Sequence, residues 1–234
     1  MKVSFERHLE SLFARFPEWD DNLRTYIELT YRDDDGDDLD EHVQVSLRVH
    51  NIFETLFKVF TAYGEFKDTW DFPARLDVFP FGQQTIVQSE KMGVRFDFGI
   101  YHNELFLHSD LSSPFYLKSM DDEFWSHFIA LKSHGQFEFL ENAVPSSNEA
   151  NMAMKELKNT KSSIFQLIRN YIILELYEGG AADIGALEIK WPVTESWDSI
   201  IKNGASAFNH LYRINYMLYR TEYLHSGSRK RLRK

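Results

Sequence analysis

The stretch VRFDFGIYHNELFLHS, residues 94–109, has the clearest structural pattern in the chain. Every second residue of its first half is apolar, so one side of an extended strand carries Val94, Phe96, Phe98 and Ile100. The tripeptide YHN then supplies a tight turn into a second strand, ELFLHS. We therefore predict antiparallel strands here, in a meander with one buried face.

Strand patterns also precede this stretch. The segments ARLDVFP and QTIVQ, at 74–80 and 84–88, are typical of strands. Further upstream, TYIELTY (25–31) and HVQVSLRV (42–49) alternate in the same way and are separated by a polar, glycine-containing segment. This pair predicts an antiparallel hairpin with a long loop.

Helical patterns surround the predicted strands, and one more strand, IGALEIKW, lies among them at 184–191. Helix signals include a cap at Ser4, a capping box at Asn51 and Glu54, and a cap at Asp121. The helices that we predict are 5–16, 51–64, 121–135, a long stretch that ends near 178, and a final helix that starts near Thr194. This order predicts an α+β fold, with a hairpin and meander sheet packed with helices and a mostly helical C-terminal third.

The domain organisation follows from the same pass along the chain. Residues 1–142 form the predicted α+β region, and the polar segment 143–151 is typical of a linker. Residues 152–228 form a helical region with one strand, and 229–234 form a basic tail. A single domain that includes all of these parts is the alternative.

Composition restricts the class of protein. The chain of 234 residues has 43% hydrophobic residues and no cysteine, which favours a folded protein without disulfides or thiolate chemistry. No apolar run is long enough for a membrane span, and charged residues interrupt the first thirteen positions where a signal peptide would be apolar. We therefore expect a cytoplasmic protein that does not bind membranes. The formal net charge of −10 argues against broad electrostatic binding of nucleic acid.

Seven carboxylates occupy the nine positions from Asp33 to Glu41, and we call this stretch the acidic segment. A calcium-binding EF-hand loop with Gly36 at its sixth position would need ligands at Tyr31 and His42, so the pattern excludes that site. The segment is either a solvated loop or a docking surface for a basic partner. The candidate binding residues are Asp33, Asp34, Asp35, Asp37, Asp38, Asp40 and Glu41.

A second candidate lies in the strand at 184–191, where Glu188 and Lys190 share one face. A strand with Glu-x-Lys and an acidic residue upstream resembles the metal site of the PD-(D/E)xK nuclease superfamily. The resemblance implies that carboxylates hold Mg²⁺ while the lysine orients a water or stabilises the transition state. Glu178 or Asp183 would be the upstream acid. The alternative is a surface strand with a salt bridge between a glutamate and a lysine.

A third candidate is the last helix, which carries a stripe of tyrosines with two arginines beside it. Tyrosine and arginine are enriched at protein interfaces and also stack on nucleobases. The helix is therefore either a nucleic-acid surface, together with the basic tail, or an ordinary packed helix. The residues concerned are Tyr212, Arg213, Tyr216, Tyr219, Arg220 and Tyr223.

No complete catalytic motif appears in the sequence. The nine histidines show no metal-binding spacing and are predicted not to cluster, and no P-loop or nucleophile elbow is present. The leading hypothesis is a non-enzymatic interaction protein, such as an inhibitor, an immunity-type protein or an adaptor, that presents the acidic segment to a basic partner and needs no cofactor. The Mg²⁺-dependent nuclease and the nucleic-acid-binding helix are the two alternatives.

Overall fold

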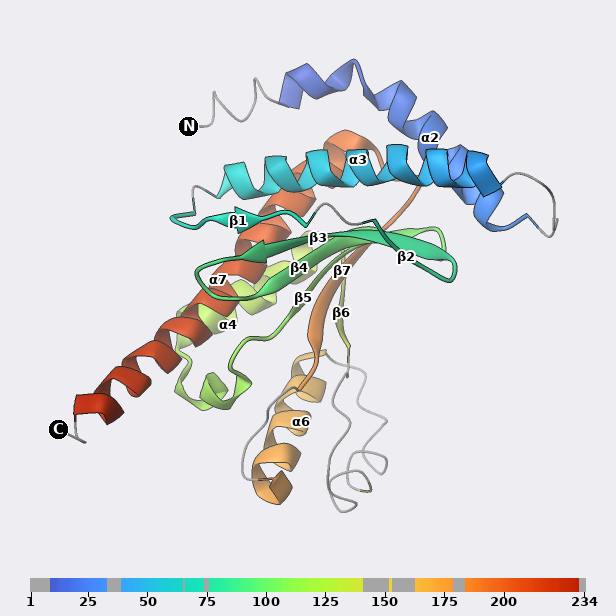
Figure 1. Ribbon diagram of the computed structural model, residues 1–234. Helices are drawn as coiled ribbons and strands as arrows, with labels where there is room; N and C mark the ends of the chain where they lie inside the picture. The colour runs from blue at the N-terminus through green and yellow to red at the C-terminus, as the bar shows by residue number, and fades with distance from the viewer. Residues whose placement is uncertain are drawn as a thin grey trace. The chain divides into compact units, whose positions relative to one another are not determined.

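The computed structural model describes residues 9–32, 39–64, 66–73, 76–140, 152, 163–178 and 184–231. The fold class is α+β, as predicted. Within these residues, seven strands form one sheet: β1 Trp70–Asp71, β2 Asp77–Phe79, β3 Gly82–Ser89, β4 Arg95–Tyr101, β5 Glu104–Asp110, β6 Gln136–Leu140 and β7 Ala186–Pro192. The principal helices are α2 Phe16–Thr30, α3 Leu39–Tyr63, α4 Asp122–Ala130, α6 Ser163–Glu178 and α7 Trp197–Arg231, with short 3₁₀ helices η1 Pro114–Ser119 and η2 Leu131–Ser133. Figure 1 shows these elements.

The sheet confirms the strands predicted from 94–109. Its order is β1-β3-β4-β5-β7-β6, with β2 paired to β3 outside this path. Strands β3 and β4 are antiparallel, and Thr85 lies opposite Phe98. His102 and Asn103 form the tight turn after β4 and both have positive φ, at 46° and 63°, as a two-residue hairpin turn requires.

The predicted hairpin of residues 25–31 and 42–49 is wrong. Both segments are helical: residues 25–30 end α2, and residues 42–49 lie in the first half of α3. The capping box predicted at Asn51 and Glu54 is also wrong, because α3 runs through both residues and Asn51 accepts a hydrogen bond from Thr55 Oγ1 inside the helix. The end of α3 at Tyr63, next to Gly64, agrees with the prediction.

The wrong strand prediction for residues 42–49 has a simple geometric cause. Four apolar residues at every second position contain two interleaved sets that are four residues apart, and a helix places each set on its own face. In α3, Val45 and Val49 are fully buried, whereas Val43 and Leu47 are exposed. Ile52 and Phe53 continue the buried face beyond the alternating stretch. The helical period of 3.6 residues therefore governs the whole segment.

The described chain divides into two compact units, and neither is a single continuous stretch. The first unit comes from Met1–Lys91, Arg95–Leu107 and Lys190–Asn209, and the second from Met92–Val94, His108–Ile189 and His210–Lys234. The predicted linker at 143–151 and the predicted cap Ser4 lie outside the described residues. The proposed domain boundary therefore stays a prediction.

In the first unit, α3 lies along one face of β3 and β4 (Figure 1). The core is a set of aromatic rings packed edge to face, in which Phe53, Phe57 and Phe60 of α3 contact Phe98 of β4. Phe208, in the first part of α7, adds contacts to both Phe57 and Phe60. These five rings are fully buried and form the aromatic core of the first unit.

The prediction of one buried face for the meander needs correction. In β4, the five residues from Phe96 to Ile100 are all buried, including Asp97. Its carboxylate is held by the Arg95 guanidinium, whose Nε lies 2.6 Å from Oδ1. A buried carboxylate needs such a charged donor, since desolvation of an unpaired charge is costly. The sequence hides this arrangement because Asp97 looks like an ordinary outward-facing residue.

The second unit contains α4, α6 and the later part of α7. The predicted cap of α4 is confirmed, because the Asp121 side chain accepts a hydrogen bond from the Phe124 backbone N–H at 3.2 Å. Asn215 of α7 is fully buried and bridges to β5 and the following loop: its Nδ2 donates to Ser109 Oγ at 3.0 Å, and its Oδ1 accepts from the Ser112 backbone N–H at 2.7 Å. None of the described helices is long and apolar enough to cross a membrane.

Candidate functional site

The acidic segment connects α2 to α3 in the sequence. Asp40 and Glu41 lie in the first turn of α3, and both are exposed. Carboxylates in this position interact favourably with the positive end of the helix dipole. The remaining acids of the segment, Asp33, Asp34, Asp35, Asp37 and Asp38, lie outside the described residues.

The helix ends on either side of the acidic segment are fixed to each other. Thr30, the last residue of α2, has its Oγ1 3.5 Å from Nε2 of His42 in the first turn of α3. The His42 ring also packs against Tyr26, with ring centroids 5.8 Å apart. The structure therefore holds residues 30 and 42 together, and the acidic segment is the chain between them.

Four aromatic side chains, Tyr31, Phe81, Tyr101 and His102, gather next to the end of α2, and we call this set the aromatic patch. Tyr31 stacks on Phe81 with centroids 5.7 Å apart, and Phe81 stacks on His102 at 5.3 Å. The Tyr31 hydroxyl lies 3.3 Å from His102 Nδ1. Tyr31 comes two residues before Asp33, so in the sequence the patch adjoins the acidic segment directly.

The aromatic patch is exposed although its rings are large and apolar. Tyr31, Phe81 and Tyr101 have exposed fractions of 39%, 49% and 44%. Phe81 also has a φ of 62°, in the left-handed region that bulky residues rarely adopt. A strained residue whose ring stays in solvent has no evident structural advantage, and such outliers concentrate at functional sites.

Glu188 and Lys190 of the nuclease hypothesis both lie in β7, and each contacts a different charged partner. Glu188 is in the second unit and is 8% exposed, and its carboxylate lies 3.5 Å from His108 Nδ1. Lys190 is in the first unit and lies 3.9 Å from the Glu104 carboxylate. Asp183 and the side chain of Glu178 lie outside the described residues, and among the residues that are described no three metal-binding side chains come together. The nuclease hypothesis stays a prediction.

The tyrosine stripe of α7 is continuous through the helix. Neighbouring rings lie 6.1 to 6.4 Å apart along Tyr212, Tyr216, Tyr219 and Tyr223. Burial decreases along the stripe, from Tyr212 at 3% exposed to Tyr223, which is largely exposed. Helix α7 continues to Arg231, so the first part of the basic tail is helical.

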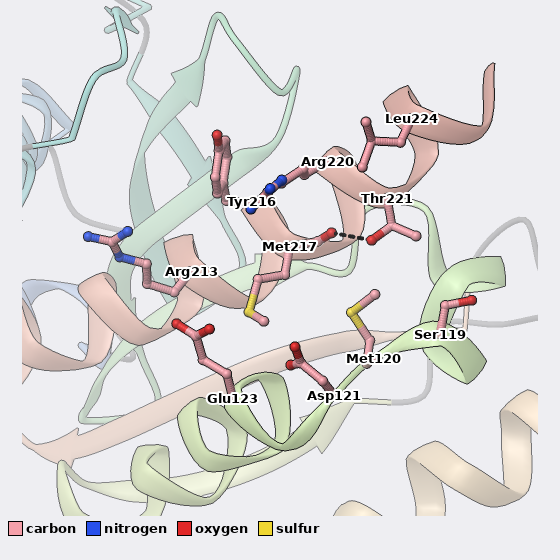
Figure 2. Close-up of a pocket in the computed structure, with 10 residues that line it drawn as sticks. All are labelled: Ser119, Met120, Asp121, Glu123, Arg213, Tyr216, Met217, Arg220, Thr221 and Leu224. Atoms are coloured by element: carbon pink, nitrogen blue, oxygen red, sulfur yellow. Dashed lines mark hydrogen bonds between the residues drawn. The ribbon is translucent and has the colours of Figure 1, made fainter. Parts of the chain in front are cut away.

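Arg213 and Arg220 are exposed and border a cavity of about 390 Å³ within the second unit. Figure 2 shows this cavity between α7 and the segment that leads into α4. Tyr216 lies between the two arginines in sequence and also lines the cavity. The full lining is Ser119, Met120, Asp121, Glu123, Arg213, Tyr216, Met217, Arg220, Thr221 and Leu224.

The expectation that the histidines do not cluster is wrong for three of them. His127 of α4 and His210 of α7 have their Nδ1 atoms 2.9 Å apart, so one ring donates a hydrogen bond and the other accepts it. His134, which caps η2, stacks on His210 with centroids 5.3 Å apart. Their separation of up to 83 positions along the chain hides this cluster from any reading of local spacing.

Two members of the histidine cluster, His127 and His210, resist protonation. Burial, helped by the neighbouring His127 and His134, lowers the pKa of His210 to about 4. Burial also lowers the pKa of His127, which Glu123 raises and Arg213 lowers. His127 and His210 therefore favour the neutral imidazole. Among the described residues, no group of three or more histidine or carboxylate side chains has the arrangement of a metal site.

No family model matches the chain, and neither a curated protein nor a solved structure matches it. A functional conclusion must therefore rest on the residues themselves.

Sequence reasoning found the acidic segment and the α7 arginines but missed the aromatic patch. Its members come from the end of α2 and from two strand turns, so only the fold brings them together. One local signal was available, since PFG at 80–82 places a phenylalanine in a turn where small or polar residues are usual.

Proposed function

We propose that this protein is a non-enzymatic interaction module that binds a basic protein partner through the acidic segment and the adjoining aromatic patch. The observation that carries the proposal is the exposed ring of Phe81, which is held at positive φ and stacks on both Tyr31 and His102. This platform lies two residues from a run of seven carboxylates.

The two parts of the surface contribute to binding in different ways. Aromatic side chains are preferred anchors at protein interfaces, because each buries a large area and loses little conformational freedom. Concentrated charge accelerates the encounter with an oppositely charged partner and disfavours partners of like charge. The acidic segment holds −7 of the formal net charge of −10, so it dominates the long-range field of the protein.

The partner should therefore have a basic surface with exposed arginine or lysine side chains. Arginine suits the aromatic patch in particular, because its planar guanidinium stacks on aromatic faces. An inhibitor or immunity-type protein would block such a surface on its target, whereas an adaptor would leave the target active. Activity of the captured partner in the bound state distinguishes these roles.

The experiment is affinity capture from native lysate with a five-Asn variant, in which Asp33, Asp34, Asp35, Asp37 and Asp38 are replaced by Asn. We expect this variant to lose the partners that the unmodified protein captures, with an unchanged melting temperature, because the replaced residues are acids of a connecting segment. A matched control replaces five exposed acids elsewhere in the first unit by their amides: Glu18, Asp21, Glu28, Asp71 and Glu90. The control removes the same charge and should retain the partners. Identical partners for both variants would refute the proposal.

A further inference from the structure

The cavity beside α7 has two walls of opposite charge. Arg213 and Arg220 come from α7, whereas Asp121 and Glu123 come from the segment that enters α4 (Figure 2). The four formal charges cancel. In the described part of the chain, no salt bridge joins either arginine to either carboxylate, so the two walls face each other without direct pairing.

Apolar side chains lie between these walls. Figure 2 shows Met120 and Met217 extending toward each other from the two sides of the cavity. Methionine side chains adapt their shape to a bound group, and thioethers pack well against aromatic rings. Tyr216 and Leu224 add further apolar surface to the lining.

Not every polar group of the cavity is available to a ligand. Asp121 Oδ1 already accepts the Phe124 N–H, and the Thr221 hydroxyl donates to the Met217 carbonyl at 2.9 Å. For Glu123, Arg213 and Arg220, no side-chain hydrogen bond is seen among the described residues. These three are the charged groups that a ligand would meet.

The arrangement selects against ligands of a single charge. The carboxylates of Glu123 and Asp121 would repel a purely anionic ligand. The two arginines would repel a purely cationic ligand. A molecule with one anionic group, one cationic group and an apolar body satisfies both walls and the methionines together. The guanidinium groups match a carboxylate, which they bind in a forked geometry.

We propose that this cavity binds a free α-amino acid with an apolar or aromatic side chain. Its carboxylate would pair with Arg220, its ammonium group with Glu123, and its side chain with Met120 and Met217. A volume of about 390 Å³ lies within the range of small-molecule sites. This site is independent of the acidic segment and the aromatic patch, so it stands even if the proposed interaction function fails.

Isothermal titration calorimetry with the full-length chain tests the site, with L-phenylalanine and L-methionine as probes. Two blocked probes separate the charges: N-acetyl-L-phenylalanine lacks the cation, and L-phenylalaninamide lacks the anion. We expect both zwitterions to bind and each blocked form to bind at least about tenfold more weakly, as expected for the loss of a charge-assisted hydrogen bond. Arg220→Gln and Glu123→Gln should each weaken the binding of L-phenylalanine by a similar factor.

The control for these variants is Arg24→Gln, which removes an exposed arginine of α2 that pairs with Asp21. It should leave binding unchanged. Circular dichroism of each variant establishes that the helices remain folded, so weaker binding is not a folding defect. Three results overturn the proposal: no binding of either amino acid at millimolar concentration, equal binding of a blocked form, or binding that the cavity variants leave unaltered.

Discussion

At the scale of single residues, Phe81 is the position where a cost in stability accompanies a proposed role in binding most clearly. Its φ of 62° costs about 1–2 kcal/mol for a residue with a side chain. The backbone at this turn would suit glycine, which adopts positive φ without strain. The chain instead retains a large exposed ring that stacks on Tyr31 and His102.

Two substitutions separate the strain at Phe81 from the ring. Phe81→Ala and Phe81→Gly both remove the ring, but only alanine keeps a Cβ at positive φ. We expect the glycine variant to be more stable than the alanine variant by about 1 kcal/mol, because it alone relieves the backbone strain. Urea denaturation of the two variants measures the difference. Both should lose partner binding, and a glycine variant that binds normally would show that the ring has no role in recognition.

At the scale of elements, the approach of α3 to α7 in the first unit depends on one glycine. A Cβ built on Gly204 of α7 would lie 2.6 Å from the ring of Phe60 in α3. Phe60 has no free space, because Phe57, Phe98 and Phe208 pack against it. This close packing of ring against backbone requires the absence of a side chain at position 204.

The usual effect of alanine in a helix should therefore reverse at this position. Gly→Ala in an exposed helix stabilises by up to about 1 kcal/mol, but we expect Gly204→Ala to destabilise by about 1–3 kcal/mol through overpacking. Ser206→Ala, two positions away, is the matched control and should change stability by less than about 0.5 kcal/mol. Thermal denaturation measures both. A more stable Gly204→Ala variant would contradict the close helix packing described above.

The histidine cluster predicts a pH dependence of stability in the second unit. Its cause is the depressed pKa of His210, about 4 in the folded chain against about 6.5 when unfolded. Below pH 6.5 the unfolded chain binds more protons at this residue, so stability falls as the pH drops from about 6.5 towards 4. Above about pH 7.5 the imidazole is neutral in both states and the dependence disappears.

His210→Asn isolates this contribution, because asparagine keeps a polar atom near the position of Nδ1 but does not titrate. We expect the melting temperature of the variant to fall less between pH 7 and pH 5 than that of the unmodified protein. Titrating carboxylates affect the pH dependence of the melting temperature equally in the variant and in the unmodified protein, so their contribution cancels in the comparison. His225→Asn, at an exposed position, serves as the control. Parallel curves for His210→Asn and the unmodified protein would exclude the cluster as the source.

The elements also show where sequence patterns are informative. The strands around YHN were predictable because alternation, a turn and a second alternating run agree over 94–109. The cap at Asp121 was predictable because its chemistry is local. The helical structure of residues 42–49 was not predictable, because apolar residues at every second position also satisfy a four-residue helical spacing. The tertiary packing of Val45 and Val49 decides between strand and helix.

At the scale of the whole molecule, the described chain folds into two units assembled from distant segments, and each carries one of the two proposed binding surfaces. The first unit carries the aromatic patch, whose Tyr31 precedes the acidic segment in the sequence, and the second carries the charged cavity of Figure 2. Composition alone pointed to the acidic segment. The patch, the cavity and the histidine cluster depend on long-range contacts, which local spacing in one sequence does not encode.

The central claim is that charge and aromatic rings together bind a basic partner, and association kinetics with a captured partner test it most directly. Charge mainly controls the rate of encounter, whereas buried anchors control dissociation. Biosensor measurements should show slower association, with a weaker salt dependence of the association rate, for the five-Asn variant. They should show faster dissociation for Phe81→Gly. Unchanged association and dissociation rates for these two variants would contradict the account.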